Sequence, residues 1–139
     1  MQKMTKAAIN DLSYKIIGCA IEVHSNLGPG LLESIYERCL TRELQLRNLE
    51  TRSQIRVPIH YKGFHLDADL RLDMLIEDTI VAEIKAVEHM NPVYEAQVLS
   101  YMKLLEKPKG ILFNFCSSNI FREGQRTFVN DVFARLPDR

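Results

Sequence analysis

The chain has 139 residues, with 18 lysines and arginines balanced by 18 aspartates and glutamates, and an apolar share of 46%. These values fit one globular domain of ordinary size over residues 1–139 and exclude a disordered, collagen-like or membrane-spanning chain. Because the formal charge is zero, bulk electrostatics do not indicate nucleic-acid binding, and any phosphate-binding surface must be local or built by oligomerisation.

Two amphipathic helices are predicted first in the chain. Residues 5–24 carry apolar side chains at three- and four-residue steps, and the glycines and proline of Gly28–Gly30 then end the helix. A second helix is expected over about 31–47. Its apolar side is predicted to contain Leu32, Ile35, Tyr36, Cys39, Leu40 and Leu44.

From residue 51 the apolar period becomes two, which predicts strands. A strand over 53–61 contains Pro58 and therefore lies at a sheet edge or ends there. After a turn at Lys62-Gly63, a long strand is expected over 65–76, with apolar side chains at all its even positions on one face. A third strand is expected over 80–86.

The register between the last two strands decides which polar side chains meet. A loop over 77–79 pairs Ile76 with Ile80 and keeps both apolar sets on one face. The same register sets Asp73 opposite Glu83, on a face that also carries Lys85. Because like charges opposite on strands are destabilising, a cation usually neutralises such a pair, or the protein uses it. The alternative is a solvated polar face with surface ion pairs.

A lysine or a divalent metal is a candidate for the neutralising charge. Lys85 is close in sequence to Glu83 and on the same side of the strand. Asp73 and Glu83, with a carbonyl such as that of Ile84, offer the all-oxygen ligands that Mg²⁺ or Mn²⁺ prefers. Both candidates stay open at this point.

The remaining elements complete a one-domain α/β order. A third helix is expected over about 93–106, with Gln97 and Tyr101 one turn apart. An internal strand is expected over 111–115, and residues 126–134 fit either a strand or a short helix. The apolar side of the third helix is predicted to contain Val98, Leu99, Met102 and Leu105.

The segment Arg71-Leu72-Asp73, followed by Glu83-Ile84-Lys85, resembles the D…(D/E)-x-K core of the PD-(D/E)xK nuclease superfamily. No proline precedes Asp73, a departure that the superfamily tolerates. Further motifs are similar to those of its GxxExxY family. Gly30, Glu33 and Tyr36 stand at the named positions, and Gln97 with Tyr101 resembles a Q-x-x-x-Y helix. The resemblance covers roughly residues 8–130.

This resemblance implies a restriction-endonuclease-like fold, with a central mixed β-sheet flanked by helices, and a nuclease that depends on Mg²⁺ or Mn²⁺. It implies that Glu33, Asp73 and Glu83 are metal ligands. Lys85 would position or activate the attacking water and stabilise charge on the phosphate. Gln97 would be the polar site residue of the following helix. Hydrolysis would leave a 5′-phosphate and a 3′-hydroxyl.

Nucleic acid is the implied partner, with DNA favoured over RNA, and a homodimer or a protein partner is also open. The alternative function is a catalytically silent nuclease-fold binding or assembly module, and hydrolysis of a smaller phosphoester is a further rival. Glu33 is alternatively a first-turn acid favoured by the helix dipole. No aromatic side chains are interleaved among the two groups of basic residues, so no platform for stacking single strands is indicated. The first group is Arg38, Arg42, Arg47, Arg52 and Arg56, and the second is Lys103, Lys107 and Lys109.

The chain is expected to be cytoplasmic and not to contact a membrane. Its three cysteines are widely spaced and form no C-x-x-C pair, which predicts reduced thiols. The N-terminal segment lacks the apolar stretch of a secretory signal.

Overall fold

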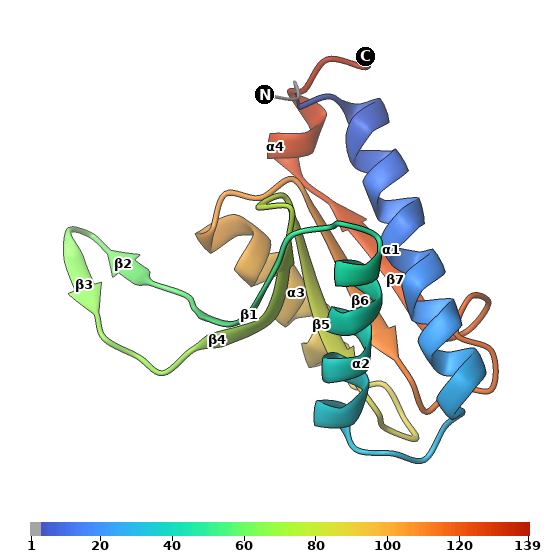
Figure 1. Cartoon of the computed structure of the whole chain (residues 1–139). Helices are drawn as coiled ribbons and strands as arrows, with labels where there is room; N and C mark the ends of the chain where they lie inside the picture. The colour runs from blue at the N-terminus through green and yellow to red at the C-terminus, as the bar shows by residue number, and fades with distance from the viewer. Residues whose placement is uncertain (1–3) are drawn as a thin grey trace.

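The computed structural model describes residues 4–139, which form a mixed five-stranded sheet with helices on both faces (Figure 1). In spatial order the strands are β1 (Thr51–Arg56), β4 (Arg71–Ile76), β5 (Ile80–Lys85), β6 (Lys109–Asn114) and β7 (Gln125–Val129). β5 and β6 run parallel, and the other neighbours run antiparallel. This architecture confirms the predicted fold class.

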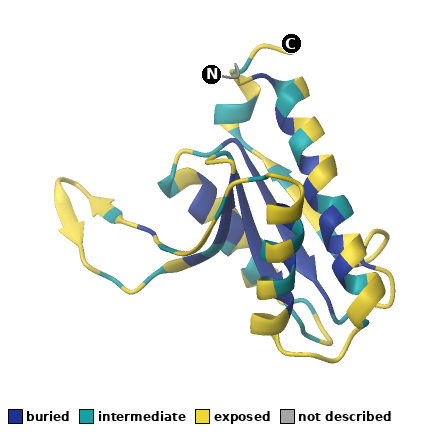
Figure 2. Cartoon of the chain, viewed as in Figure 1, coloured by how far each residue is buried: buried dark blue, intermediate teal, exposed yellow. Residues whose placement is uncertain are grey.

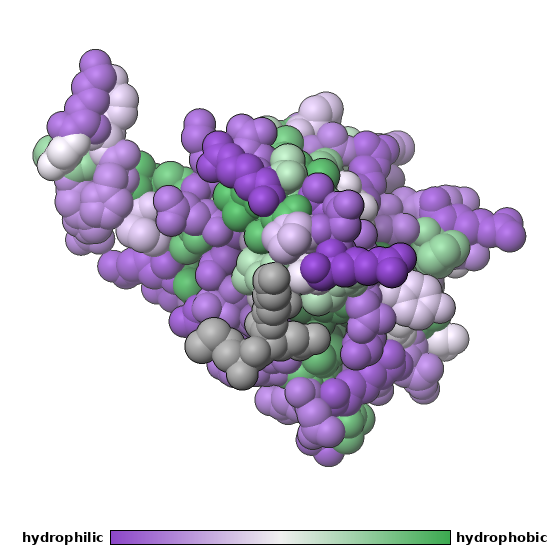
Figure 3. All heavy atoms as spheres, turned by 90° about the horizontal axis from the view of Figure 1, so that it is seen from above, coloured by the Kyte–Doolittle hydropathy of each residue, from purple (hydrophilic) through white to green (hydrophobic). Residues whose placement is uncertain are grey.

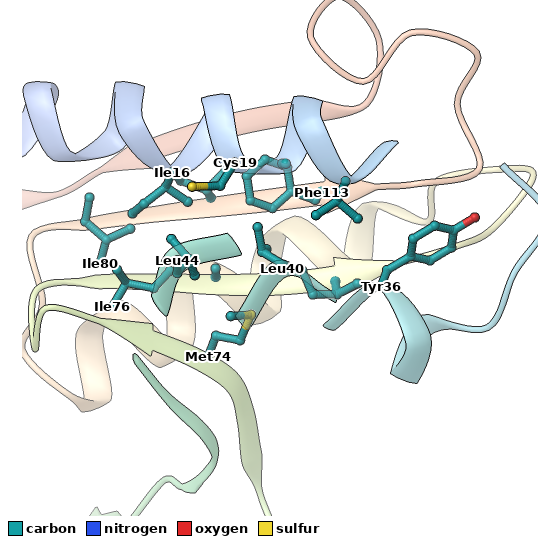
Figure 4. Close-up of a cluster of buried hydrophobic side chains, with 14 of the residues drawn as sticks. Ile16, Cys19, Tyr36, Leu40, Leu44, Met74, Ile76, Ile80 and Phe113 are labelled. Carbon is teal, nitrogen blue, oxygen red and sulfur yellow. The ribbon is translucent and has the colours of Figure 1, made fainter. Parts of the chain in front are cut away.

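The sheet separates two apolar clusters. On one face, α1 (Lys6–Leu27) and α2 (Glu33–Leu46) cover the larger cluster, which Figure 4 shows with side chains from both helices and the central strands. On the other face, α3 (Pro92–Leu104) packs through Val98, Tyr101 and Met102. With both sheet faces covered, every residue of β6 and all of β5 except Lys85 are buried.

The helix bounds agree with the predicted ranges to within a few residues, but three apolar positions were assigned to the wrong side. Leu32 is 70% exposed because α2 begins only at Glu33, which leaves Leu32 in the preceding loop. Ile35 and Leu99 are also exposed, at 38% and 43%. Tyr101 lies in the core beside Val98 and Met102.

The predicted strands over 53–61 and 65–76 are each interrupted, and this is the main correction to the expected fold. β1 ends at Arg56, and a separate hairpin of β2 (Ile59–Tyr61) and β3 (Phe64–Leu66) projects from the sheet before β4 begins. The segment that leaves β1 and the segment that enters β4 are joined by a hydrogen bond from the Val57 N–H to the Leu70 carbonyl. Beyond this bond the two segments separate, where no helix covers the sheet. We call residues 57–70 the arm.

The C-terminal segment contains both of the structures that its sequence allowed. β7 is followed by α4 (Asp131–Ala134), whose start is fixed by the Asn130 side chain, which accepts a hydrogen bond from the Phe133 N–H. Among the described residues, no helix is long and apolar enough to span a membrane.

Candidate active site

Contrary to the prediction from the sequence, the side chains of β4 do not alternate regularly between the two sheet faces, because the alternation breaks at Asp73. The β1–β4 ladder pairs Ser53 with Met74 and Ile55 with Leu72 but skips the intervening pair, at which Gln54 has a φ of 52°. As a result Leu72 lies in the cluster under α3, whereas Met74 lies in the cluster under α1 and α2. The left-handed backbone at Gln54 is the local distortion that accompanies the switch.

The distortion leaves the Asp73 carboxylate free to reach between strands. Its Oδ2 accepts a hydrogen bond from the Ile84 N–H at 2.8 Å, and its Oδ1 accepts one from Gln54 Nε2 at 3.3 Å. The β4–β5 pairs Ile76–Ile80 and Met74–Ala82 confirm the predicted register. The backbone pairing of β4 with β5 ends at Met74 and Ala82. Beyond it, the Ile84 N–H donates to the Asp73 side chain rather than to the β4 backbone, so the carboxylate is held where β4 and β5 separate.

Glu83 is a buried carboxyl group beside Asp73. It is 5% exposed, and its Oε1 has no hydrogen-bond partner in the described part of the chain. Burial is the main cause that raises the pKa of Glu83 to about 9; the hydrogen bond and negative charge of Asp73 contribute to this rise, and the Lys85 charge opposes it. A buried polar atom of this kind is costly without a partner, and a bound cation would satisfy it.

Lys85 lies against α3. Its Nζ is 4.5 Å from the centroid of the Tyr94 ring, a cation–π contact that orients the ammonium group. Tyr101, on the same helix, lies within electrostatic range of both carboxyl groups. Burial raises the pKa of its hydroxyl, and the charges of Glu83 and Asp73 raise this pKa as well. The structure thus brings Asp73, Glu83 and Lys85 to one end of β4 and β5.

A pocket of about 250 Å³ opens beside Asp73 towards α2. Its lining residues are Glu33, Ser34, Glu37, Gln54, Asp73 and Ile84. The Gln54 amide donates to Glu37 Oε1 at 2.8 Å and so links Glu37 to Asp73. Burial raises the pKa of Glu37, the Gln54 hydrogen bond opposes this, and the charges of Asp73 and Glu33 add to it.

Glu37 and Gln54 were missed by the sequence analysis. Glu37 follows Glu33 by one helical turn, so helical spacing could have placed it on the same side of α2. Gln54 has no comparable signal, because its position depends on the distortion of β1.

The predicted three-carboxylate set is only partly assembled. Glu33 lines the pocket with Asp73, whereas Glu83 is buried and is not among the residues that line the pocket. Within residues 4–139, no three His, Cys, Asp or Glu side chains are grouped closely enough to hold a metal ion together. Gln97 is half-buried on α3, one turn before Tyr101, and is not among the residues that line the pocket.

The donor set nevertheless fits a hard divalent cation. Asp73 and Glu83 supply carboxylate oxygens, and the Glu83 Oε1 atom is buried without a partner in the described chain. Oxygen ligands of this kind suit Mg²⁺ or Mn²⁺. Asp73 and Glu83 are the residues that would hold such an ion.

Tyr36 positions α2 from inside the core. It is fully buried and stacks on Phe115, with 4.6 Å between ring centroids. Its hydroxyl, visible at the end of the cluster in Figure 4, donates to the Gly28 carbonyl at 2.5 Å and accepts from the Leu31 N–H at 3.1 Å. Gly30 has a φ of 104°, which favours glycine. This loop sets where α2 begins, and therefore where Glu33 stands.

A mixed sheet enclosed by helices, with an aspartate, a glutamate and a lysine at the ends of two neighbouring strands, defines a restriction-endonuclease-like α/β fold. Residues 10–127 match the family model described as the PD-(D/E)XK nuclease superfamily. The chain belongs to this superfamily. It matches no curated protein and no solved structure.

Proposed function

We propose that the protein is a metal-dependent nuclease that hydrolyses nucleic-acid phosphodiesters at Asp73, Glu83 and Lys85. The observation that carries this proposal is the buried, unpartnered Oε1 of Glu83 beside Asp73, in a chain of a nuclease superfamily. A stable fold does not require a buried carboxyl group beside a second carboxylate, whereas carboxylate oxygens are the ligands that a hard divalent cation prefers.

A divalent ion held by Asp73 and Glu83 would lower the pKa of a bound water and offset charge on the phosphate. Lys85 would place its ammonium group against the same phosphate, and the Tyr94 ring restrains that side chain before substrate arrives. Gln54 would keep Asp73 oriented by its amide hydrogen bond.

The finer assignments belong to the same proposal. Glu33 is proposed as an outer acidic ligand at the pocket, and Gln97 as a polar contact from α3. The order of motifs supports membership of the GxxExxY family, with DNA as the favoured polymer and Mg²⁺ or Mn²⁺ as the ion. A cytoplasmic location and a homodimer or protein partner are also part of the proposal.

Cleavage assays test the activity directly. Purified protein is incubated with Mg²⁺ or Mn²⁺ and a panel of single- and double-stranded DNA and RNA. We expect cleavage that Lys85→Met abolishes, because methionine keeps the packing on Tyr94 but removes the charge. Lys103→Met is the matched control, since Lys103 is an exposed lysine on α3. Equal behaviour of wild type and Lys85→Met would refute the nuclease.

Titration calorimetry with Mn²⁺ separates the nuclease from a catalytically silent module. We expect wild type to bind Mn²⁺ and Asp73→Asn to bind it at least about tenfold more weakly, as loss of a carboxylate ligand typically costs. Metal binding that does not depend on Asp73, together with no cleavage, would favour the silent binding or assembly module instead.

A further inference from the structure

The arm leaves the sheet directly beside the candidate active site. It joins β1, which carries Gln54, to β4, which carries Asp73, and it stands away from the body in Figures 1 and 3. Figure 2 shows that most of it is exposed. A strand of nucleic acid bound at Asp73 would therefore have the arm as its neighbour on the β1 side.

The hairpin within the arm has one apolar face that nothing in the described chain covers. The pairs Ile59–Leu66 and Tyr61–Phe64 are directly opposite on the two strands, and side chains at these alternate positions share a face. Tyr61, Phe64 and Leu66 are 65%, 62% and 44% exposed. A two-stranded hairpin without a covering layer is at best marginally stable in water, so this face is suited to a partner.

The turn places a cation beside the Tyr61 ring. Lys62 and Gly63 have φ values of 47° and 78°, as in the tight turns that connect two-residue hairpins. A lysine in this left-handed conformation is uncommon. Its Nζ is 5.4 Å from the Tyr61 ring centroid, so a positive charge and two exposed aromatic faces are presented together at the tip.

The acidic residues of the arm do not oppose this charge. Asp67 pairs with Arg56 at 3.3 Å, and Asp69 pairs with Arg71 at 2.9 Å, both at the base of the arm. Their charges are thereby locally balanced, and Lys62 remains as the cation of the tip. The combination of a phosphate-attracting charge with exposed aromatic rings is complementary to a strand whose bases are unpaired.

We propose that the arm binds single-stranded nucleic acid, with bases stacked on Tyr61 and Phe64 and a phosphate against Lys62. This inference rests on the proposed function, because it places the bound strand beside the nuclease site. The expectation of no stacking platform was drawn from the larger groups of basic residues, whereas Lys62 stands between Tyr61 and Phe64 in the sequence and contacts the Tyr61 ring.

Fluorescence anisotropy in EDTA tests the arm without cleavage. The probes are a labelled single-stranded DNA of mixed sequence, an RNA of the same sequence, and the blunt DNA duplex. The variant is Tyr61→Leu/Phe64→Leu, which keeps the apolar character but removes both stacking faces. We expect it to bind the single strands at least about tenfold more weakly, since each stacked base contributes about that much. Binding to the duplex should be unchanged.

The matched control is Tyr14→Leu/Phe121→Leu, which removes two exposed aromatic rings outside the arm, at 77% and 55% exposure. It should bind every probe like wild type. Sedimentation velocity of each protein is measured alongside. The proposal is overturned by unchanged single-strand binding in the arm variant, by equal losses on single strand and duplex, or by a wild-type dimer that the arm variant converts to a monomer, which would assign the face to a second copy.

The outcomes for the arm and for the nuclease are separable. Arm-dependent binding of single strands with no Lys85-dependent cleavage refutes the nuclease and leaves the arm's role intact. If cleavage depends on Lys85 but the arm variant binds single strands as tightly as wild type, the arm's role is refuted and the nuclease proposal stands.

Discussion

At the scale of single residues, Glu83 shows a conflict between stability and chemistry. Its carboxyl group lies in the core, next to a second carboxylate, with one oxygen unpartnered in the described structure. A glutamine of the same shape would avoid the cost of ionising there. In the proposed nuclease, the glutamate would give the site an ionisable oxygen ligand that exchanges its proton for a cation.

The raised pKa of Glu83 makes stability depend on pH. Because its pKa is about 9 in the folded protein and 4.5 in the unfolded chain, the folded state holds the proton more tightly. The resulting stabilisation is complete below pH 4.5 and is lost as pH rises through 9. We predict that Glu83→Gln removes most of this pH dependence. At pH 9 its free energy of unfolding should exceed that of the wild type by on the order of a few kcal/mol.

Urea unfolding with a chelator present, at acid, neutral and alkaline pH, measures this difference. Glu88→Gln is the control, because Glu88 is exposed just beyond β5 and its variant should follow the wild-type curve. Parallel pH profiles for wild type and Glu83→Gln would show that Glu83 is ionised in the fold already.

At the scale of elements, the close approach of α3 to the sheet fixes the position of the site. α3 carries Tyr94 over Lys85 and Tyr101 beside the carboxylates, and it packs on β6 at Gly110. A methyl group at Gly110 would lie 2.6 Å from Val98 Cγ1 and 2.8 Å from Met102 Sδ, closer than real contacts allow. The absence of a side chain at Gly110 therefore sets the spacing between α3 and β6.

We predict that Gly110→Ala lowers the free energy of unfolding by about 1–3 kcal/mol, because buried core side chains would have to shift. Gly18→Ala is the matched control: its methyl group would meet only the flexible end of Arg47 at 3.2 Å, and alanine favours the interior of α1. Gly18→Ala should be neutral or stabilising. Equal stabilities of the two variants in urea and thermal unfolding would contradict this account of α3 packing.

The elements also show what the sequence could and could not predict. Helical spacing located α1, α2 and α3, and the alternation of Ile76, Ile80 and Ala82 gave the correct register, because both signals are local and follow from burial. The arm was missed because its alternating pattern is that of a strand with a buried face, whereas its apolar face is uncovered within the described chain.

The candidate site was predicted where it depends on strand register and missed where it depends on backbone distortion. Asp73, Glu83 and Lys85 follow from pairing across a short turn. The face switch at Asp73 and the role of Gln54 depend on a positive φ that no residue type at that position announces. Glu37 joins the pocket only because α2 packs over β1 and β5.

At the scale of the whole molecule, the balance of 18 basic and 18 acidic residues has a consequence for substrate binding. Several of the acidic groups are concentrated at the site, since Glu33, Glu37 and Asp73 line one pocket and Glu83 lies beside it. Without a cation, this end of the molecule repels phosphate. A bound divalent ion would offset most of this negative charge, and with these carboxylates neutralised the remaining surface is modestly basic.

This charge distribution predicts opposite effects of Asp73→Asn in the two metal conditions. In EDTA, the variant should bind a DNA duplex about two- to fivefold more tightly than wild type, because one repulsive charge is removed at a partly exposed position. With Mn²⁺, the order should reverse, because wild type gains the ion's charge at the site and the variant does not.

Fluorescence anisotropy at low and physiological salt measures both affinities, and the differences between the proteins should shrink as salt rises. Asp131→Asn, an exposed change on α4, should show no reversal. If Asp73→Asn is weaker than wild type in both conditions, repulsion at the site does not limit binding, and the neutral surface must meet its substrate by contacts elsewhere.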